Sequence, residues 1–251
     1  MYHSITFGDK NTYDDWHLMP SSRPVFNPPE VKMKTIDLPG ANGVLDMSEA
    51  LTGYPLFNNR KGSFEFYVLN DYWNSWKDAY SSISNYIHGR QMKAILDDDK
   101  TYYYFGRFAV NEWKSEEGHS KIVIDYNVDP YKYLVTGLPE RWMWDPFNFL
   151  TDRVPETKFS EIKVPTGGIT LEFSEMNYGK MPVSPIVTCS APVTMVFKNE
   201  TLGLNETIAL KAGENKFTNF DDVIFYGPKV SCRFETDAEV AISMDFRAGS
   251  L

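Results

Sequence analysis

The chain has 251 residues, enough for one large β domain or two of ordinary size, and either can bury a hydrophobic core. Its 17 Phe and 15 Tyr favour strands, because aromatic residues suit pleated, half-buried surfaces. The formal charge of −9 is spread evenly, with 14 Lys and Arg against 18 Asp and Glu up to Leu134 and 11 against 16 afterwards. This even acidity argues against specific binding of nucleic acid, which needs a cationic face.

No apolar run approaches the roughly 20 residues that span a bilayer, and the first ten residues, MYHSITFGDK, contain no apolar signal core. We therefore expect a soluble protein without a membrane partner, made and kept in the cytosol of its producer.

Strand patterns dominate the first half of the chain. A short strand is expected at 4–7, and SFEFYVL places Phe64, Phe66 and Val68 on one face of a longer strand. The segments QMKAIL, TYYYFGRFAV and KIVIDYNV then predict a meander of three strands.

One helix interrupts these strands. Asp71 offers an N-terminal cap and Gly89 a stop, which predicts a helix at about 71–88. Apolar residues at three- and four-residue spacing define its buried face. They are Trp73, Trp76, Tyr80, Ile83 and Ile87.

The sequence from Gly167 onward predicts an all-β second domain. GITLEF, PIVTCS, PVTMVF, ETIAL, KFTNF, VIFYG, VSCRF and EVAISMDF read as short strands joined by turns, as in an antiparallel sandwich or jelly roll. The segment 137–150 contains two prolines and a cluster of aromatic residues, and we place the junction between the two domains there. We expect a β domain with one helix at 1–138 and a β-sandwich at 139–251.

Catalytic and cofactor signatures are missing. No GxSxG, HExxH, GxxxxGK or GxGxxG occurs, and the four histidines are scattered singly. The acidic run Asp97, Asp98 and Asp99 lacks the glycine and the distant glutamate of an EF-hand loop, so we interpret it as a β-turn. We assign no catalytic, cofactor-binding or metal-binding residue and expect a protein that is not an enzyme.

Two features of the second domain leave alternatives open. Cys189 and Cys232 lie in strand-like segments without a CxxC pattern and are either small core residues or a disulfide. Asn199 and Asn205 each begin an NxT triplet, which we interpret as turns. A sugar site would stack pyranose rings on Trp or Tyr, and Tyr178 and Tyr226 are the only such residues after Asp145.

Ordered motifs of the first half resemble those of a known family. They are ITFGDKNTYDDWHL, IDLPGANGVLDMSEALTGYPLFNNRKGSFEF, DDDKTYYYFGRF and VDPYK, and they span about residues 3 to 132. Together they look like the distal tail proteins (Dit) of siphophages and prophages of Gram-positive bacteria. The second domain carries weaker signals.

The resemblance implies a structural protein of the phage tail tip, assembled in the cytoplasm of the host bacterium. Members of that family form a six-membered ring through the N-terminal domain, with a galectin-like or carbohydrate-module-like sandwich projecting outward. The ring joins the tail tube to the baseplate and serves as hub for the tail-associated lysin or tail fibre and, in many phages, for receptor-binding proteins. DNA passes through such a ring without specific binding, and an acidic lumen would suit that passage.

The stretch LPGANGVLDMSEALTGYP, residues 38–55, is too apolar and too rich in glycine for an idle connector. The resemblance assigns it to the belt of the ring, with Asp37, Leu38, Asp46, Ser48 and Thr52 as interface residues. A loop folded over its own core is the alternative.

Two other functions compete with a ring-forming hub. One is an adhesion module whose sandwich binds saccharide of the host cell wall, and the other is a cell-wall hydrolase, for which no motif argues.

Overall fold

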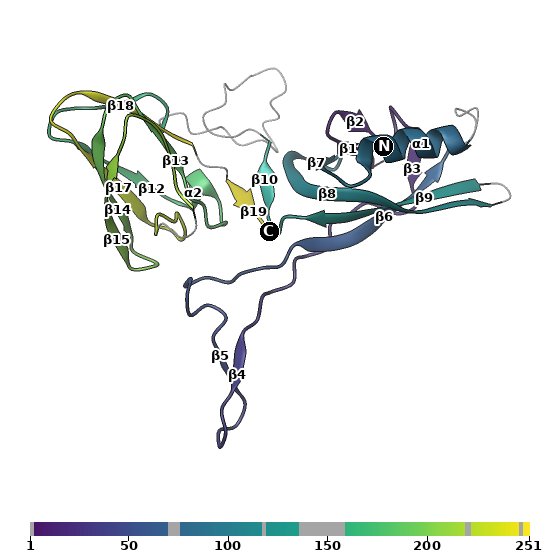
Figure 1. Cartoon of the computed structure of the whole chain (residues 1–251), viewed down its shortest axis with the longest axis horizontal. Helices are drawn as coiled ribbons and strands as arrows, with labels where there is room; N and C mark the ends of the chain where they lie inside the picture. Colours follow the sequence, from purple (N-terminus) through teal and green to yellow (C-terminus); the bar gives the residue numbers. More distant parts are fainter. Residues whose placement is uncertain (1–2, 70–75, 117–118, 136–158, 219–221, 246–247) are drawn as a thin grey trace. The chain divides into compact units, whose positions relative to one another are not determined.

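The computed structural model describes residues 3–69, 76–116, 119–135, 159–218, 222–245 and 248–251 (Figure 1). Its contacts divide the chain into two compact units, Met1–Lys132 and Tyr133–Ser250, here called unit 1 and unit 2. The junction predicted at 137–150 lies outside the described residues, so the boundary at 138 stays a prediction.

Unit 1 is built on one antiparallel sheet. Its strands are β1 (Ile5–Phe7), β2 (Lys10–Asn11), β3 (Leu18–Pro20), β6 (Arg60–Val68), β7 (Arg90–Leu96), β8 (Asp99–Glu116) and β9 (His119–Val128). They are ordered β2-β1-β7-β8-β9-β6-β3, with the long β8 and β9 at the centre. The expected strand near residue 4 and the expected meander are both present.

The alternation predicted for SFEFYVL is confirmed. Phe64, Phe66 and Val68 of β6 are buried, and β6 pairs with β9 so that Phe64 lies opposite Ile124 and Phe66 opposite Ile122. These residues belong to one hydrophobic cluster that covers the inner face of the sheet.

The helix α1 (Trp76–Ile87) covers this core. Ile83 and Ile87 are fully buried, as their spacing predicts, whereas Tyr80 lies at the margin with its ring 5.4 Å from that of Trp113. The expected first turn at 71–75 lies outside the described residues. The helix ends before Gly89, whose φ of +74° is the left-handed conformation expected of a C-terminal stop.

Unit 2 contains two four-stranded antiparallel sheets, and each buries one face. One sheet is β11 (Ile162–Val164), β18 (Val240–Asp245), β13 (Ile186–Cys189) and β16 (Gly213–Lys216), in that order. The other is β12 (Ile169–Phe173), β17 (Val230–Glu235), β14 (Val193–Asn199) and β15 (Leu204–Leu210). Alternate residues of β18 and β14 are buried, which is the sandwich pattern that the sequence predicts.

Three elements of unit 2 differ from the prediction. VIFYG forms a single bridge between Phe225 and Val183 rather than a strand, because the Phe225 ring packs among Phe173, Tyr178 and Phe197. β16 ends at Lys216, where KFTNF was expected to begin. The remaining elements are the four-residue helix α2 (Glu175–Tyr178), which was not expected, and β10 (Lys132–Leu134), which pairs with β19 (Gly249–Ser250).

The two cysteines are free and buried, so the disulfide alternative is excluded. Cys189 and Cys232 belong to different sheets of unit 2. Burial raises the pKa of the Cys189 thiol to about 11, which keeps it protonated and unreactive at neutral pH.

The first NxT triplet organises a turn from inside the core. Asn199 is fully buried, and its side-chain amide donates to the carbonyls of Ile224 at 2.8 Å and Tyr226 at 3.0 Å. Its Oδ1 accepts hydrogen bonds from the backbone amides of Thr201 and Leu202. The two accepted bonds hold the turn between β14 and β15, and the two donated bonds tie that turn to residues 224–226.

We expect Asn199→Ala to lower the free energy of unfolding by roughly 2–4 kcal/mol, because it leaves buried carbonyls and amides unpaired. Asn205→Ala, in the exposed second triplet, is the matched control and should change it by less than about 0.5 kcal/mol. Chemical denaturation of the full chain measures both, and equal effects would contradict the role of Asn199.

Candidate functional site

A long two-stranded ribbon extends away from the sheet of unit 1 (Figure 1). We call residues 27–59 the arm; its distal end holds β4 (Thr35–Asp37) and β5 (Val44–Asp46). Nearer the sheet, Val31 pairs with Phe57, and the amides of Lys32 and Asn58 donate to the carbonyls of Leu56 and Glu30, both at 2.8 Å. The stretch expected to be a loop therefore includes one strand of an antiparallel ribbon, which is paired at its distal end and again near the sheet.

The second strand of the arm carries an insertion, which we call the shoulder (residues 48–54). Val31 pairs with Phe57 and Thr35 with Asp46, so seven more residues separate the pairs on the second strand than on the first. A single turn, with the Gly53 amide bonded to the Glu49 carbonyl at 2.8 Å, accommodates them. Leu51 at this turn is completely exposed.

Aromatic packing fixes the base of the arm. Phe26 is buried, its ring stacked 3.9 Å from that of Tyr104 and edge-on to Phe64 and Tyr126 at 5.0 and 4.8 Å. The hydroxyl of Tyr126 accepts a hydrogen bond of 2.9 Å from the Asn27 amide. The arm thus leaves the body from a rigid point.

Arg60 secures the returning strand at the same point. Its guanidinium is buried and donates to the carbonyls of Asn27 at 3.0 Å and Pro130 at 2.8 Å, and it lies 5.5 Å from the centre of the Tyr104 ring. Its Nη2 has no partner among the described residues. Burial lowers the pKa of this group, but an arginine stays charged at any physiological pH. No carboxylate in the described part of the chain pairs with this guanidinium. Burial of an unpaired charge is costly, which indicates a positioning role rather than net stabilisation.

The arm concentrates exposed apolar side chains. Of the fourteen large hydrophobic side chains exposed in the described residues, nine lie between Val31 and Leu56. They are Val31, Met33, Ile36, Leu38, Val44, Leu45, Met47, Leu51 and Leu56. The arm does not fold over its own core, and a patch of this kind typically marks a protein–protein contact.

The distal ribbon has one apolar face and one face that holds both of its carboxylates. Ile36 lies opposite Leu45, and the alternation of side chains places Leu38 and Met47 on the same face. The other face carries Asp37 and Asp46, with Val44 directly opposite Asp37. The predicted interface residues thus share the arm but not one surface, since Leu38 faces away from both carboxylates.

Two of the five predicted interface residues serve the arm itself. Ser48 Oγ accepts a bond of 2.8 Å from the Lys34 amide and donates to Asp46 Oδ1 at 2.5 Å, while Thr52 Oγ1 donates to the Tyr54 carbonyl at 2.7 Å. The Ser48 hydroxyl and amide hold the pKa of the Asp46 carboxyl below its ordinary value, so it stays charged at mildly acidic pH.

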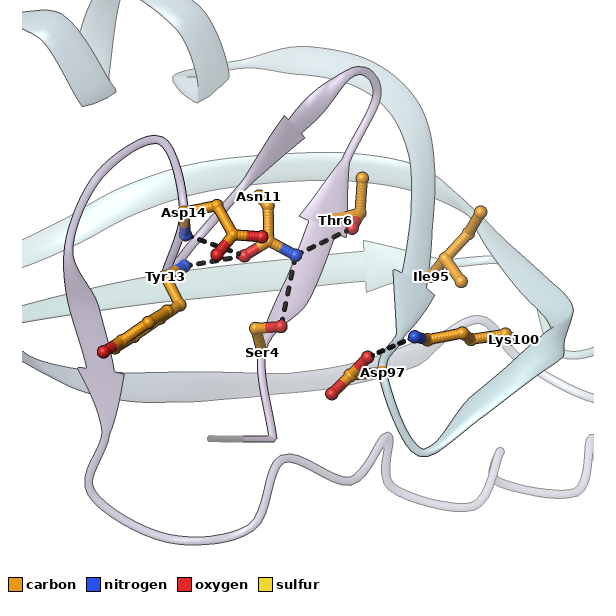
Figure 2. A pocket seen from close by; sticks show the side chains of 8 residues that line it. All are labelled: Ser4, Thr6, Asn11, Tyr13, Asp14, Ile95, Asp97 and Lys100. Carbon is orange, nitrogen blue, oxygen red and sulfur yellow. Dashed lines mark hydrogen bonds and ion pairs between the residues drawn. The ribbon is translucent and has the colours of Figure 1, made fainter. Parts of the chain in front are cut away.

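A hollow between β1, β2 and the turn before β8 offers no ligand chemistry (Figure 2). The Asn11 side chain donates to the hydroxyls of Ser4 and Thr6 and accepts from the amides of Tyr13 and Asp14. Lys100 pairs with Asp97 at 2.7 Å. These polar groups satisfy one another, which is the pattern of a structural network.

The acidic run at 97–99 is also used internally. Asp97 pairs with Lys100, Asp99 with Lys132 at 2.8 Å, and Asp98 with His3 at 2.8 Å and Arg23 at 2.7 Å. The hydrogen bond from His3 is the largest cause that lowers the pKa of Asp98. Across the described residues, no group of three His, Cys, Asp or Glu side chains could hold a metal ion.

Unit 2 shows no platform for sugar stacking in its described part. Tyr178 is fully buried with its hydroxyl donating to the Gly227 carbonyl, and Tyr226 is only partly exposed.

The described stretches contain no helix that is both long enough and apolar enough to cross a membrane.

Known proteins resemble this chain in structure but not in sequence. No protein-family model matches the sequence, and no curated protein is significantly similar to it. Five solved chains are similar in structure, among them SPP1 Dit, described as a paradigm of hub adsorption apparatus in Gram-positive infecting phages. The superposition of this chain on SPP1 Dit has a TM-score of 0.56 at 12% sequence identity, and it covers 100% of both chains. The fold is Dit-like. At this identity the Dit likeness establishes the fold alone.

The role of Arg60 can be tested by Arg60→Met, which keeps the apolar volume and removes the donors. We expect amide exchange at 27–32 and at Asn58 to accelerate about tenfold, while the free energy of unfolding changes by less than about 1 kcal/mol. Hydrogen exchange and chemical denaturation measure the two quantities. The exposed Arg90→Met is the control, and unchanged exchange in the arm would refute a positioning role.

Proposed function

We propose that this protein is a non-enzymatic structural component of a phage tail, a distal hub whose copies join through the arm into a six-membered ring. The observation that carries the proposal is the arm: an anchored ribbon with nine exposed apolar side chains on a Dit-like fold. A two-stranded ribbon in water is marginal by itself, so an arm that keeps this composition requires a partner surface.

The free energies of burial and association favour an assembly of several copies over an isolated pair. Full burial of one exposed Leu, Ile or Met side chain contributes about 1.5–3 kcal/mol. Leu51 is fully exposed and the four apolar residues of the distal ribbon are roughly half exposed, so together they supply roughly 4–8 kcal/mol gross. Loss of rigid-body freedom on association costs about 4–15 kcal/mol. The two are comparable, so assembly depends on concentration and gains from closure of a ring.

The proposed partners follow from the role of a distal tail hub. Copies of this chain form the ring, the tail tube lies on one side of it, and the tail-associated lysin or tail fibre, with receptor-binding proteins in some phages, lies on the other. The place of action is the tail tip of the virion, after assembly in the host cytoplasm. DNA passes through the ring without specific binding.

Leu51 offers a clean test because no intramolecular contact is lost when an exposed side chain is shortened. We expect Leu51→Ser to weaken self-association about tenfold or more, the equivalent of losing about 1.5–3 kcal/mol of burial. Sedimentation velocity over a concentration series measures the change. Met19→Ser is the matched control, because Met19 is a large exposed apolar residue outside the arm.

Electron microscopy of the oligomer, formed alone or with its tail partners, tests the ring itself. Six-fold symmetry supports the proposal. A protein that stays monomeric at tens of micromolar even with those partners would contradict it.

A further inference from the structure

A hollow of about 570 Å³ lies at the base of the arm, lined by residues of the arm, β6 and β9. Its wall includes two lysines, Lys32 and Lys61, and four asparagines, Asn27, Asn58, Asn59 and Asn127. Glu30 is the only carboxylate among the lining residues. The hollow is therefore rich in hydrogen-bond donors and carries a net positive charge.

Most polar side chains of this hollow have no partner among the described residues; the exception is Asn27, whose side-chain amide donates to the Lys61 carbonyl at 3.0 Å. Within the described residues, no hydrogen bond or ion pair engages the side chains of Lys32 and Lys61 or the other three amides, those of Asn58, Asn59 and Asn127. The hollow of Figure 2 differs, because its polar groups bind one another. Free donors at the base of the arm are available to an anionic, hydrogen-bonding occupant.

The opposite end of the arm carries the complementary charge. Asp37 and Asp46 share one face of the distal ribbon, and residues 35–46 contain no Lys or Arg. The ion pairs found in the described part of unit 1 all lie outside the arm. Two like charges on one face repel each other until a cation approaches.

The acidic end cannot reach the hollow of its own chain. Seven residues of extended strand separate Glu30 from Asp37, which is about 23 Å at 3.3 Å per residue. Building on the proposed ring, we propose that the hollow at the base of the arm receives the acidic end of the arm of a second copy. Lys32 and Lys61 meet Asp37 and Asp46 of that copy, and the three amides donate to its carboxylates and backbone.

This contact is heterologous, since the distal end of one copy meets the base of the next. Repetition of one such contact generates an open helix or a closed ring, of which a dimer with reciprocally exchanged arms is the smallest. Exposed ion pairs add little affinity, so the apolar face supplies most of the attraction and the charges select orientation and register.

Charge reversal tests the pairing. Lys32→Glu with Lys61→Glu, and separately Asp37→Lys with Asp46→Lys, should each weaken self-association about tenfold or more at low ionic strength, because like charges are then juxtaposed. Asp37→Lys alone keeps the Asp46–Ser48 bonds and guards against a misfolded arm. Sedimentation velocity measures association, and circular dichroism confirms folding.

The decisive experiment is whether self-association is restored when both charge reversals are combined. The fourfold variant has a basic distal end and an acidic hollow, so it should associate like the wild type. An equimolar mixture of the two double variants should also assemble, because each distal end then meets a hollow of opposite sign. Lys180→Glu with Lys211→Glu changes the net charge equally on exposed residues of unit 2, and this control should leave association unchanged.

A substitution of Glu30 is expected to strengthen self-association rather than weaken it. Glu30→Gln removes the one carboxylate that repels an acidic occupant and should strengthen association.

The outcomes separate the two proposals. If the wild type assembles, Leu51→Ser weakens assembly and the charge-reversal variants do not, the proposed binding of an arm in the hollow is wrong. The proposed ring then still stands. Double variants that weaken association without rescue in the fourfold variant or in the mixture would also overturn the proposed binding in the hollow. A wild type that never self-associates would overturn both.

Discussion

A two-stranded antiparallel ribbon has two faces and no interior, so the arm cannot bury apolar side chains by itself. Ile36 and Leu45 touch across the ribbon and remain roughly half exposed, and Leu51 on the shoulder touches nothing. A helix or a larger sheet of the same composition would turn one face to the body of the protein. Here the sequence keeps these residues on a projection, and the most direct physical explanation is that another surface covers them.

What makes such a projection useful is the stiffness of its base. Phe26 packs among three aromatic rings, and Arg60 links both strands of the arm to the body through the carbonyls of Asn27 and Pro130. Order that is already present before contact lowers the entropy lost on association. The Ser48 hydroxyl extends this order outward by joining the Lys34 amide to Asp46.

Local signals in the sequence predicted much of the fold. The alternation of Phe64, Phe66 and Val68 and the spacing of Ile83 and Ile87 depend only on neighbouring residues, and both patterns appear in the structure. The glycine content that marked residues 38–55 is used in turns, since Gly40, Gly43 and Gly53 have left-handed φ of +87°, +79° and +73°. The bridge at Phe225 escaped prediction because contacts with rings distant in sequence decide it.

The candidate site was harder to predict for the same reason. Composition singled out residues 38–55, and the structure places them on an exposed arm, but it separates Leu38 from Asp37 and Asp46 by the thickness of the ribbon. Arg60 and Asn127 gave no local signal, because their neighbours come together only through the register of β6 and β9.

Arg60 has one more consequence if copies join from end to base. In such an assembly the direction in which the arm leaves the body sets the rotation from each copy to its neighbour, and that rotation decides how many copies close a circle. A hinge at this point would allow circles of several sizes and open spirals. The buried guanidinium and the Phe26 stack would therefore determine the copy number of the assembly from beneath the surface that receives the neighbouring arm.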